Sequence, residues 1–244
     1  MIISIITITY NNAAGLVRTI ASLHEQRDVE VEHIIVDGES TDGTAEILDR
    51  ERKRATVITR RARGVYEAIN AGIQAASGDI VGLLHAGDVF SDAHVLADVR
   101  KIMEKTDSPH YIYGDIHYNK RNGHPGRKFS GAPACRKTML TGFRPPHLSL
   151  YIKREAQSRI GLYSLNYRIA GDYEMLLRIF FDDSLQGRYI KRDMVAMEPG
   201  GLATRAKSRL WTNNSERIKA LKANGLPASW LALLKHYYYL FLHK

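Results

Sequence analysis

The stretch that decides the fold is "VEHIIVDGESTDGTAEILDRER", residues 31–52, in which a strand-like pattern passes directly into a helix-like pattern. Its first seven residues read as a strand that ends in the carboxylate Asp37. Ser40, Thr41 and Asp42 follow as cap candidates for a helix that runs through "GTAEILDRER". A strand followed at once by a helix is the unit from which parallel sheets are built.

The same alternation of strand and helix patterns extends on both sides of this stretch. It predicts right-handed βαβ units in a mostly parallel sheet that helices cover on both faces. The predicted strands outside 31–37 are 2–9, 55–59, 78–84, 110–118 and 188–197, and the further predicted helices are 13–26, 65–76 and 171–181.

The bulk composition fits a soluble globular protein. An apolar share of 44% over 244 residues is enough to bury a core. The single cysteine, Cys135, excludes an internal disulfide and favours a reducing cytoplasm. The apolar start "MIISIITITY" is short and lacks a basic leader, so we expect a buried strand there.

The net charge of +9 is placed unevenly. Residues 116–154 contain nine Lys and Arg and no acid, and within them 119–147 are expected to form a long functional loop. Residues 205–244 form a basic segment that ends in "SWLALLKHYYYLFLHK". This ending is too short and too charged to span a bilayer, and it suits either an amphipathic segment at a membrane surface or a helix docked on the core.

Polar side chains follow the predicted parallel strands at their carboxyl ends, where open α/β sheets bind their ligands. No "GxGxxG" or "GxxxxGK[ST]" follows any strand, which argues against a dinucleotide dehydrogenase and a P-loop enzyme. The polar side chains at these ends are Thr9, Tyr10 and Asn11, then Asp37, and then His85 and Asp88 in "LLHAGD".

Four stretches, "ISIITITYNN", "IIVDGESTDGT", "GVYEAINAGIQAASGDIVGLLHAGD" and "AGDYEMLLR", resemble family 2 glycosyltransferases. The resemblance is greatest to small bacterial enzymes of exopolysaccharide and O-antigen assembly, and covers 2–90 strongly and 140–202 more loosely. It implies an α/β, Rossmann-like GT-A fold over 1–204, with a nucleotide-sugar-binding half (1–90) and an acceptor-side half (110–204). Residues 205–244 would be a basic amphipathic C-terminal helical appendage.

The resemblance also implies roles for residues on the donor side. Asp37 would accept the base N–H. Asp88 would bind Mg²⁺ or Mn²⁺ on the donor diphosphate, and one carboxylate is sufficient where phosphates and water supply the other oxygens. The remaining donor-binding residues would be Thr9, Tyr10, Asn11, Asn70 and His85.

On the acceptor side, Asp172 matches the general base, with Glu174 and Asp115 as the next candidates. His147 and Arg144 would lie near the acceptor, and "EPGGLAT" (198–204) resembles a flexible loop near the donor phosphates. The sequence departs from its relatives in three places: His85 stands where Asn is usual, Gly87 where many have a second acid, and the arginines of "TRRARG" where an acid is frequent.

The predicted activity is inverting transfer of a sugar, a hexose or deoxyhexose, from a nucleotide-diphosphate sugar to a saccharide hydroxyl. The predicted acceptor is a saccharide on a polyprenyl diphosphate, and the predicted location is cytoplasmic, peripheral on the inner face of the cell membrane, with an anionic surface as partner. Two alternatives stay open: a nucleotidyltransferase that makes a sugar nucleotide, and a non-catalytic module that binds nucleotide or nucleic acid. No nucleic-acid motif is recognised, so nucleic acid is not an expected partner.

Overall fold

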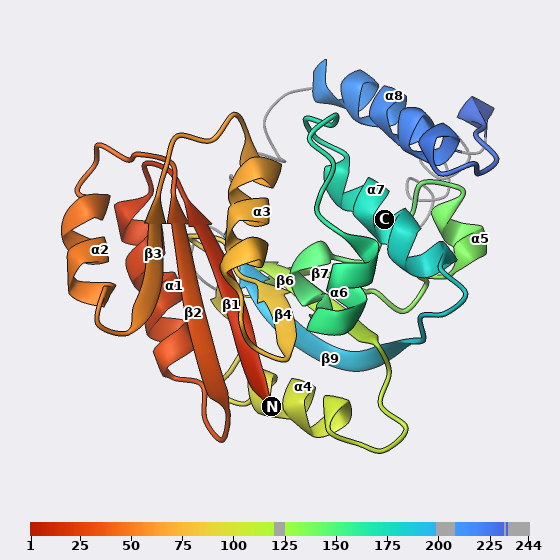
Figure 1. The fold of residues 1–244 in the computed structure, drawn as a ribbon. Helices are drawn as coiled ribbons and strands as arrows, with labels where there is room; N and C mark the ends of the chain where they lie inside the picture. Colours follow the sequence, from red (N-terminus) through yellow and green to blue (C-terminus); the bar gives the residue numbers. More distant parts are fainter. Residues whose placement is uncertain (120–124, 199–207, 232, 234–244) are drawn as a thin grey trace.

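The computed structural model describes residues 1–119, 125–198, 208–231 and 233, which Figure 1 shows as a ribbon. Every strand and helix predicted from the sequence is present, with ends that shift by a few residues. The strands are β1 (Ile2–Thr9), β2 (Glu30–Asp37), β3 (Ala55–Thr59), β4 (Ile80–Leu83), β5 (Val89–Phe90), β6 (Tyr111–Asn119), β7 (Pro125–Phe129), β8 (Tyr151–Lys153) and β9 (Gly187–Met197).

Helices fill the connections between these strands, and a 3-10 turn, η1 (His147–Ser149), precedes β8. The helices are α1 (Ala13–His24), α2 (Thr44–Glu51), α3 (Val65–Ala75), α4 (Val95–Met103), α5 (Arg136–Met139), α6 (Arg154–Ile160), α7 (Gly171–Phe181) and α8 (Ser208–Ala223).

The first half of the chain forms a parallel sheet in the order β3-β2-β1-β4. Successive residues of β2 point to opposite faces, so Ile34 and Val36 pack with Ile69 of α3, whereas Ile35 packs with Leu16 of α1. Both faces are therefore covered by helices, as the apolar strand patterns predicted (Figure 1).

The second half continues the same sheet with mixed directions. From β4 the order runs β8-β6-β9-β5, in which only the β6–β9 pairing is parallel, and β7 pairs with β6. The prediction of a long loop over 119–147 is wrong where β7 and α5 form. Both elements are short and lack a periodic pattern, because pairing with β6 and packing beside α7 decide their structure.

The turn before α2 also differs from the prediction. Its N-cap is Gly43, at a φ of +89°, and none of the three predicted residues caps this helix with its side chain. Asp42 instead accepts hydrogen bonds from the backbone N–H of Ala13 (2.9 Å) and the hydroxyl of Thr44 (2.6 Å). The carboxylate thus ties the start of α1 to the start of α2.

The described part of the C-terminal segment packs on the domain. Figure 1 shows α8 over α7, and Ala220 and Leu221 of α8 are fully buried in the main core. Leu233 is buried as well, while Trp230 and Leu231 are exposed. Residues 199–207, 232 and 234–244, which include most of the "EPGGLAT" loop and of the aromatic ending, lie outside the described residues. No helix in the described ranges is long and apolar enough to cross a membrane.

Candidate active site

The carboxyl ends of β1, β2 and β4 meet at one edge of the sheet. Thr9 and Asp37 are register partners on adjacent strands. The backbone N–H of Ala86, just after β4, donates to the carbonyl of Ile8 at 3.1 Å. The strand-end residues predicted to bind the donor are thereby brought to the same edge.

Polar side chains at this edge fix the conformation of the segment after β2. Asp37 is 3% exposed and accepts hydrogen bonds from the hydroxyl (2.5 Å) and the backbone N–H (3.1 Å) of Ser40. Asn11, at a φ of +48°, accepts from the backbone N–H of Thr41 at 2.8 Å. Its own N–H donates to Ser40. Asp37 therefore organises its own turn, and its contact with a base stays a prediction.

Thr9 and Tyr10 contribute two different surfaces to this edge. The Thr9 hydroxyl is buried without a hydrogen-bond partner. Tyr10 is 66% exposed, and a Cβ at Gly38 would lie 3.1 Å from its ring. An exposed aromatic ring held against a glycine backbone provides a flat face on which a planar group can stack.

Asp88 lies in a tight turn whose backbone is fixed by Thr19 of α1. The Thr19 hydroxyl donates to the carbonyl of Asp88 at 2.7 Å and accepts from the N–H of Gly87 at 2.9 Å. Gly87 has a φ of +106°, a conformation that side chains rarely adopt, so glycine at this position reflects backbone geometry. The turn presents a single carboxylate at the end of β4.

The Asp88 carboxylate is buried, with 8% of the residue exposed. The carboxylate accepts a hydrogen bond from the backbone N–H of Glu198, at 3.3 Å. Burial raises the pKa of Asp88 to about 7; the Glu198 hydrogen bond opposes this shift and the Glu198 charge adds to it. The Glu198 side chain itself pairs with Arg18 at 2.6 Å.

This environment fits a divalent ion that needs few protein ligands. Within the residues that the structure describes, no group of three or more His, Cys, Asp or Glu side chains could hold a metal ion. Magnesium commonly uses one or two carboxylates and takes its other oxygens from phosphates and water. The pKa of a buried carboxylate is raised where nearby positive charge does not offset the cost of burial, and a divalent ion would supply such charge.

Asp172 begins α7 on the opposite half of the sheet and is 5% exposed. One carboxylate oxygen lies 3.2 Å from Nε of Arg144 and 3.6 Å from Nδ1 of His147. The other accepts the backbone N–H of Tyr173 at 2.8 Å. The three residues predicted for the acceptor side are therefore in contact.

The pKa of Asp172 is lowered in this site. Burial alone would raise it, but the Arg144 guanidinium, and then His147, favour the charged carboxylate. Burial lowers the pKa of His147 and the charge of Asp172 opposes this shift, so Arg144 provides most of the positive charge. Asp172 is consequently ionised at neutral pH, as a general base must be.

A pair of histidines joins the two halves of the site. Nε2 of His85, at the end of β4, lies 3.4 Å from Nε2 of His147, which contacts Asp172 through its other ring nitrogen. Burial, and then the neighbouring His147, lower the pKa of His85 to about 3. Its Nδ1 is buried without a hydrogen-bond partner, as is Nη1 of Arg144. Within the described residues, these two nitrogens of the site have no hydrogen-bond partner.

Asn70 differs from the other predicted donor residues. Its amide donates to the carbonyl of Tyr163 and accepts from the N–H of the same residue, both at 2.8 Å. This pairing joins α3 to the segment before α7. The structure therefore shows a contact that holds two segments together, and this geometry gives no support to the predicted donor contact.

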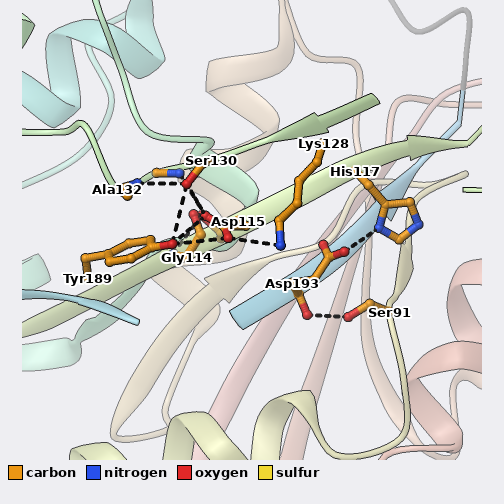
Figure 2. Close-up of polar contacts among 11 residues, drawn as sticks. Ser91, Gly114, Asp115, His117, Lys128, Ser130, Ala132, Tyr189 and Asp193 are labelled. Carbon is orange, nitrogen blue, oxygen red and sulfur yellow. Dashed lines mark hydrogen bonds and ion pairs between the residues drawn. The ribbon is translucent and has the colours of Figure 1, made fainter. Parts of the chain in front are cut away.

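The two carboxylates considered next after Asp172 have partners of their own. Glu174 forms an ion pair with Arg178 at 2.9 Å. Figure 2 shows Asp115, which is 2% exposed, enclosed by polar groups. It accepts hydrogen bonds from Ser130, the N–H of Gly131 and Tyr189, and it pairs with Lys128. These contacts favour Asp172 over both residues as the base.

A parallel sheet with polar strand ends and a buried, ionised carboxylate beside them has the architecture of an α/β enzyme. The model of the family described as Glycosyl transferase family 2 matches residues 4–160, and the chain belongs to this family. It is 29% identical over 191 residues to a PGL/p-HBAD biosynthesis glycosyltransferase of Mycobacterium bovis (strain BCG / Pasteur 1173P2), covering 77% of this chain and 73% of that protein. An uncharacterized glycosyltransferase of Mycobacterium tuberculosis (strain CDC 1551 / Oshkosh) is 32% identical over 179 residues, covering 72% and 68%.

Solved structures confirm the GT-A-type fold. Staphylococcus aureus TarS 1-349 in complex with UDP-GlcNAc superposes with a TM-score of 0.71 at 16% identity, over 91% of this chain. The mannosyltransferase PcManGT from Pyrobaculum calidifontis in complex with GDP-Man and Mn²⁺ gives a TM-score of 0.64 at 17% identity, over 94%. The chain spans 66% of each of those chains, slightly under two thirds of their length.

Several residues of the site lay outside the sequence-based prediction. Thr19, Tyr66 and Glu216 fix the turns that hold Asp88 and Asp172, and none of them follows a strand end. Gly171 is a fourth, because a Cβ there would lie 2.6 Å from the ring of Tyr66. The close approach of this ring gives a physical reason for the glycine of "AGDYE", which the sequence alone showed only as a residue preceding a helix.

Proposed function

We propose that the protein is an inverting glycosyltransferase that moves a sugar from a nucleotide-diphosphate sugar to a saccharide hydroxyl. The observation that most supports this is the contact between Arg144, His147 and an ionised, buried Asp172, joined through His85 to the donor-side turn. A single displacement that inverts the anomeric centre requires one base, and the carboxylate of Asp172 can fill that role.

In this proposal Asp172 accepts the proton of the acceptor hydroxyl as that oxygen attacks the anomeric carbon. The bond from the anomeric carbon to the diphosphate breaks in the same step, and the nucleoside diphosphate leaves with the electron pair. Arg144 keeps Asp172 ionised beforehand. Its Nη1 and the Nδ1 of His85 are buried and have no hydrogen-bond partner in the described part of the chain.

The donor half provides the nucleotide site. Tyr10 offers a stacking face, Asp37 and Asn11 offer polar groups, and Asp88 would hold Mg²⁺ or Mn²⁺ on the diphosphate. The ion, when bound, would stabilise the negative charge that the leaving diphosphate gains. TarS and PcManGT, which share the fold, are described in complexes with UDP-GlcNAc and with GDP-Man and Mn²⁺. Those complexes support a nucleotide-sugar donor for this chain.

Thermal unfolding with nucleotides tests the proposal directly. UDP, GDP, dTDP, CMP, UTP and GTP are added with Mg²⁺, with Mn²⁺ or with EDTA. We expect at least one nucleoside diphosphate to stabilise the protein, and to do so more strongly with an ion. Ligand at 100 times its dissociation constant adds about 2.7 kcal/mol. Stabilisation only by triphosphates would favour nucleotidyl transfer, and stabilisation by none would favour a non-catalytic module.

We further propose that the acceptor is a saccharide on a polyprenyl diphosphate, at the inner face of the cell membrane, in the synthesis of a surface polysaccharide. Support comes from the aromatic and basic residues of 229–244, a composition that suits a membrane interface. The full-length protein should sediment with vesicles that contain anionic lipid, and less so as salt screens the charges. Equal sedimentation with neutral and anionic vesicles would contradict the membrane part of the proposal.

A further inference from the structure

The segment that leads into Asp172 is held by a side chain from the far end of the described chain. The carboxylate of Glu216, on α8, accepts three hydrogen bonds from consecutive backbone N–H groups, at 3.0, 2.8 and 2.8 Å. Their donors are Arg168, Ile169 and Ala170. No other side chain in the described ranges is shown with three such contacts to this segment.

The next two amides are held from the opposite half. The hydroxyl of Tyr66, on α3, accepts from Gly171 at 2.9 Å and from Asp172 at 3.2 Å, and it donates to the carbonyl of Ile169 at 2.6 Å. Every backbone N–H from 168 to 172 is therefore bound to one of two side chains. The backbone that orients Asp172 is defined from both sides.

This arrangement answers a local requirement of α7. The first amides of a helix have no partner within the helix, and the N-cap residue, Ala170, has no side chain that could provide one. A carboxylate at this end is also favoured by the helix dipole. Glu216, from another helix, binds the first of these amides, that of Ala170, and Tyr66 binds the next two.

The position of Glu216 is fixed by the packing of α8. Arg217 lies over the ring of Tyr173, 5.7 Å from its centre. Lys219 donates to the carbonyl of Asn166 at 3.0 Å. With Ala220 and Leu221 fully buried, α8 is anchored on α7 rather than suspended beside it.

We infer that Glu216 is a positioning residue for the reaction, which holds residues 168–170 so that the carboxylate of Asp172 meets the acceptor hydroxyl. The inference rests on the proposed role of Asp172 as the base. It makes α8 a functional part of the enzyme, although the sequence suggested an appendage. Glu216 itself touches no reacting atom.

The expected effect is on turnover and not on donor binding. Glu216→Ala releases three amides, and residues 168–170 then find other partners, with Asp172 displaced. A base moved by about 1 Å from its working geometry can lose on the order of 10²-fold in rate. We expect Glu216→Ala to lower kcat by about 10- to 100-fold, with the affinity for the stabilising nucleoside diphosphate and Mg²⁺ unchanged. Lys222→Ala, an exposed change on the same helix, is the matched control and should match the wild type.

A double-mutant cycle separates positioning from a general loss of structure. If Glu216 acts through Asp172, Glu216→Ala should cost little further rate in an Asp172→Asn background. Equal losses in both backgrounds, or a wild-type kcat for Glu216→Ala, would overturn the inference. If Glu216→Ala is too unstable to assay, Glu216→Gln takes its place in the cycle. Glutamine retains an acceptor oxygen, so the expected loss of rate is smaller, and the same criterion applies. Failure of the proposed role of Asp172 can be told apart from failure of this inference, because Asp172→Asn alone would then turn over at the wild-type rate.

Discussion

The two halves of the molecule place their functional residues in different ways. In the first half, Thr9 and Asp37 are register partners at the ends of parallel strands, and Asp88 follows β4 in a turn that Thr19 of α1 fixes. In the second half, Asp172 begins a helix whose position depends on side chains distant in sequence, Tyr66 and Glu216 among them. A site at strand ends follows from the fold, whereas a site at a helix start depends on particular contacts.

The largest effect is expected from Asp172→Asn. Asparagine keeps the size of the side chain and an oxygen for the N–H of Tyr173, but it cannot take up the proton. Turnover of the donor with its acceptor should fall by roughly 10²–10⁴-fold, the usual contribution of a general base. Thermal stability is the control. A variant that turns over close to the wild-type rate would reduce Asp172 to an ion-pair partner of Arg144.

A smaller effect is expected from pH in the donor half. Because the pKa of Asp88 is raised to about 7, its carboxyl is mostly protonated at pH 6 and mostly ionised at pH 8. A divalent ion binds the ionised form, so the Mg²⁺-dependent affinity for a nucleoside diphosphate should be about tenfold weaker at pH 6 than at pH 8. Calorimetry at the two pH values measures this. Asp88→Asn should retain only the dependence that titration of the nucleotide phosphate contributes, and a wild type with no greater dependence than Asp88→Asn would contradict the assignment.

Arg144→Met tests the electrostatics of the acceptor half. Removing the guanidinium leaves burial to raise the pKa of Asp172, so the base becomes protonated at higher pH than in the wild type. The acid limb of the kcat profile should therefore move to higher pH. Arg144→Lys, which retains the charge, should move it less. An unchanged acid limb in Arg144→Met would show that Arg144 does not control the ionisation of Asp172.

The smallest effect is expected from His85→Asn. This change places at position 85 the residue that is usual in the family. It also removes the 3.4 Å contact with His147. Because the pKa of His85 is lowered by burial, the imidazole is uncharged at neutral pH and its loss removes no charge from the site. Donor affinity and turnover should both stay near the wild-type values. A total loss of Mg²⁺-dependent binding would instead identify His85 as a metal ligand.

The sequence could predict the first half because its signals are local. Each of β1 to β4 has a strand-like run of apolar, often β-branched residues, and a polar residue lies at the strand's end or within two positions after it. The periodicity of 171–181 likewise identified α7. Asp37 and Asp88 could be named from their places at strand ends, whereas Asp172 was named from the resemblance of "AGDYEMLLR" to the family.

The remaining features depend on contacts that no local pattern reveals. β8 is three residues long and exists because it pairs with β4 and β6. Asn70 looked like a donor residue within a family-like stretch, but its amide meets the backbone of Tyr163, 93 positions away. Glu216 was one acid in a basic segment, and its partners lie 46 to 48 positions earlier.

Calorimetric binding of a nucleoside diphosphate with Mg²⁺ to the wild type, Asp88→Ala and Asp172→Asn tests the division of labour between the halves most directly. Asp88 belongs to the donor half, so Asp88→Ala should bind no more tightly with Mg²⁺ than with EDTA. Asp172 belongs to the acceptor half, so Asp172→Asn should bind as tightly as the wild type while its turnover is lost. If Asp172→Asn loses donor binding to the same extent as Asp88→Ala, the two halves do not divide the reaction in this way.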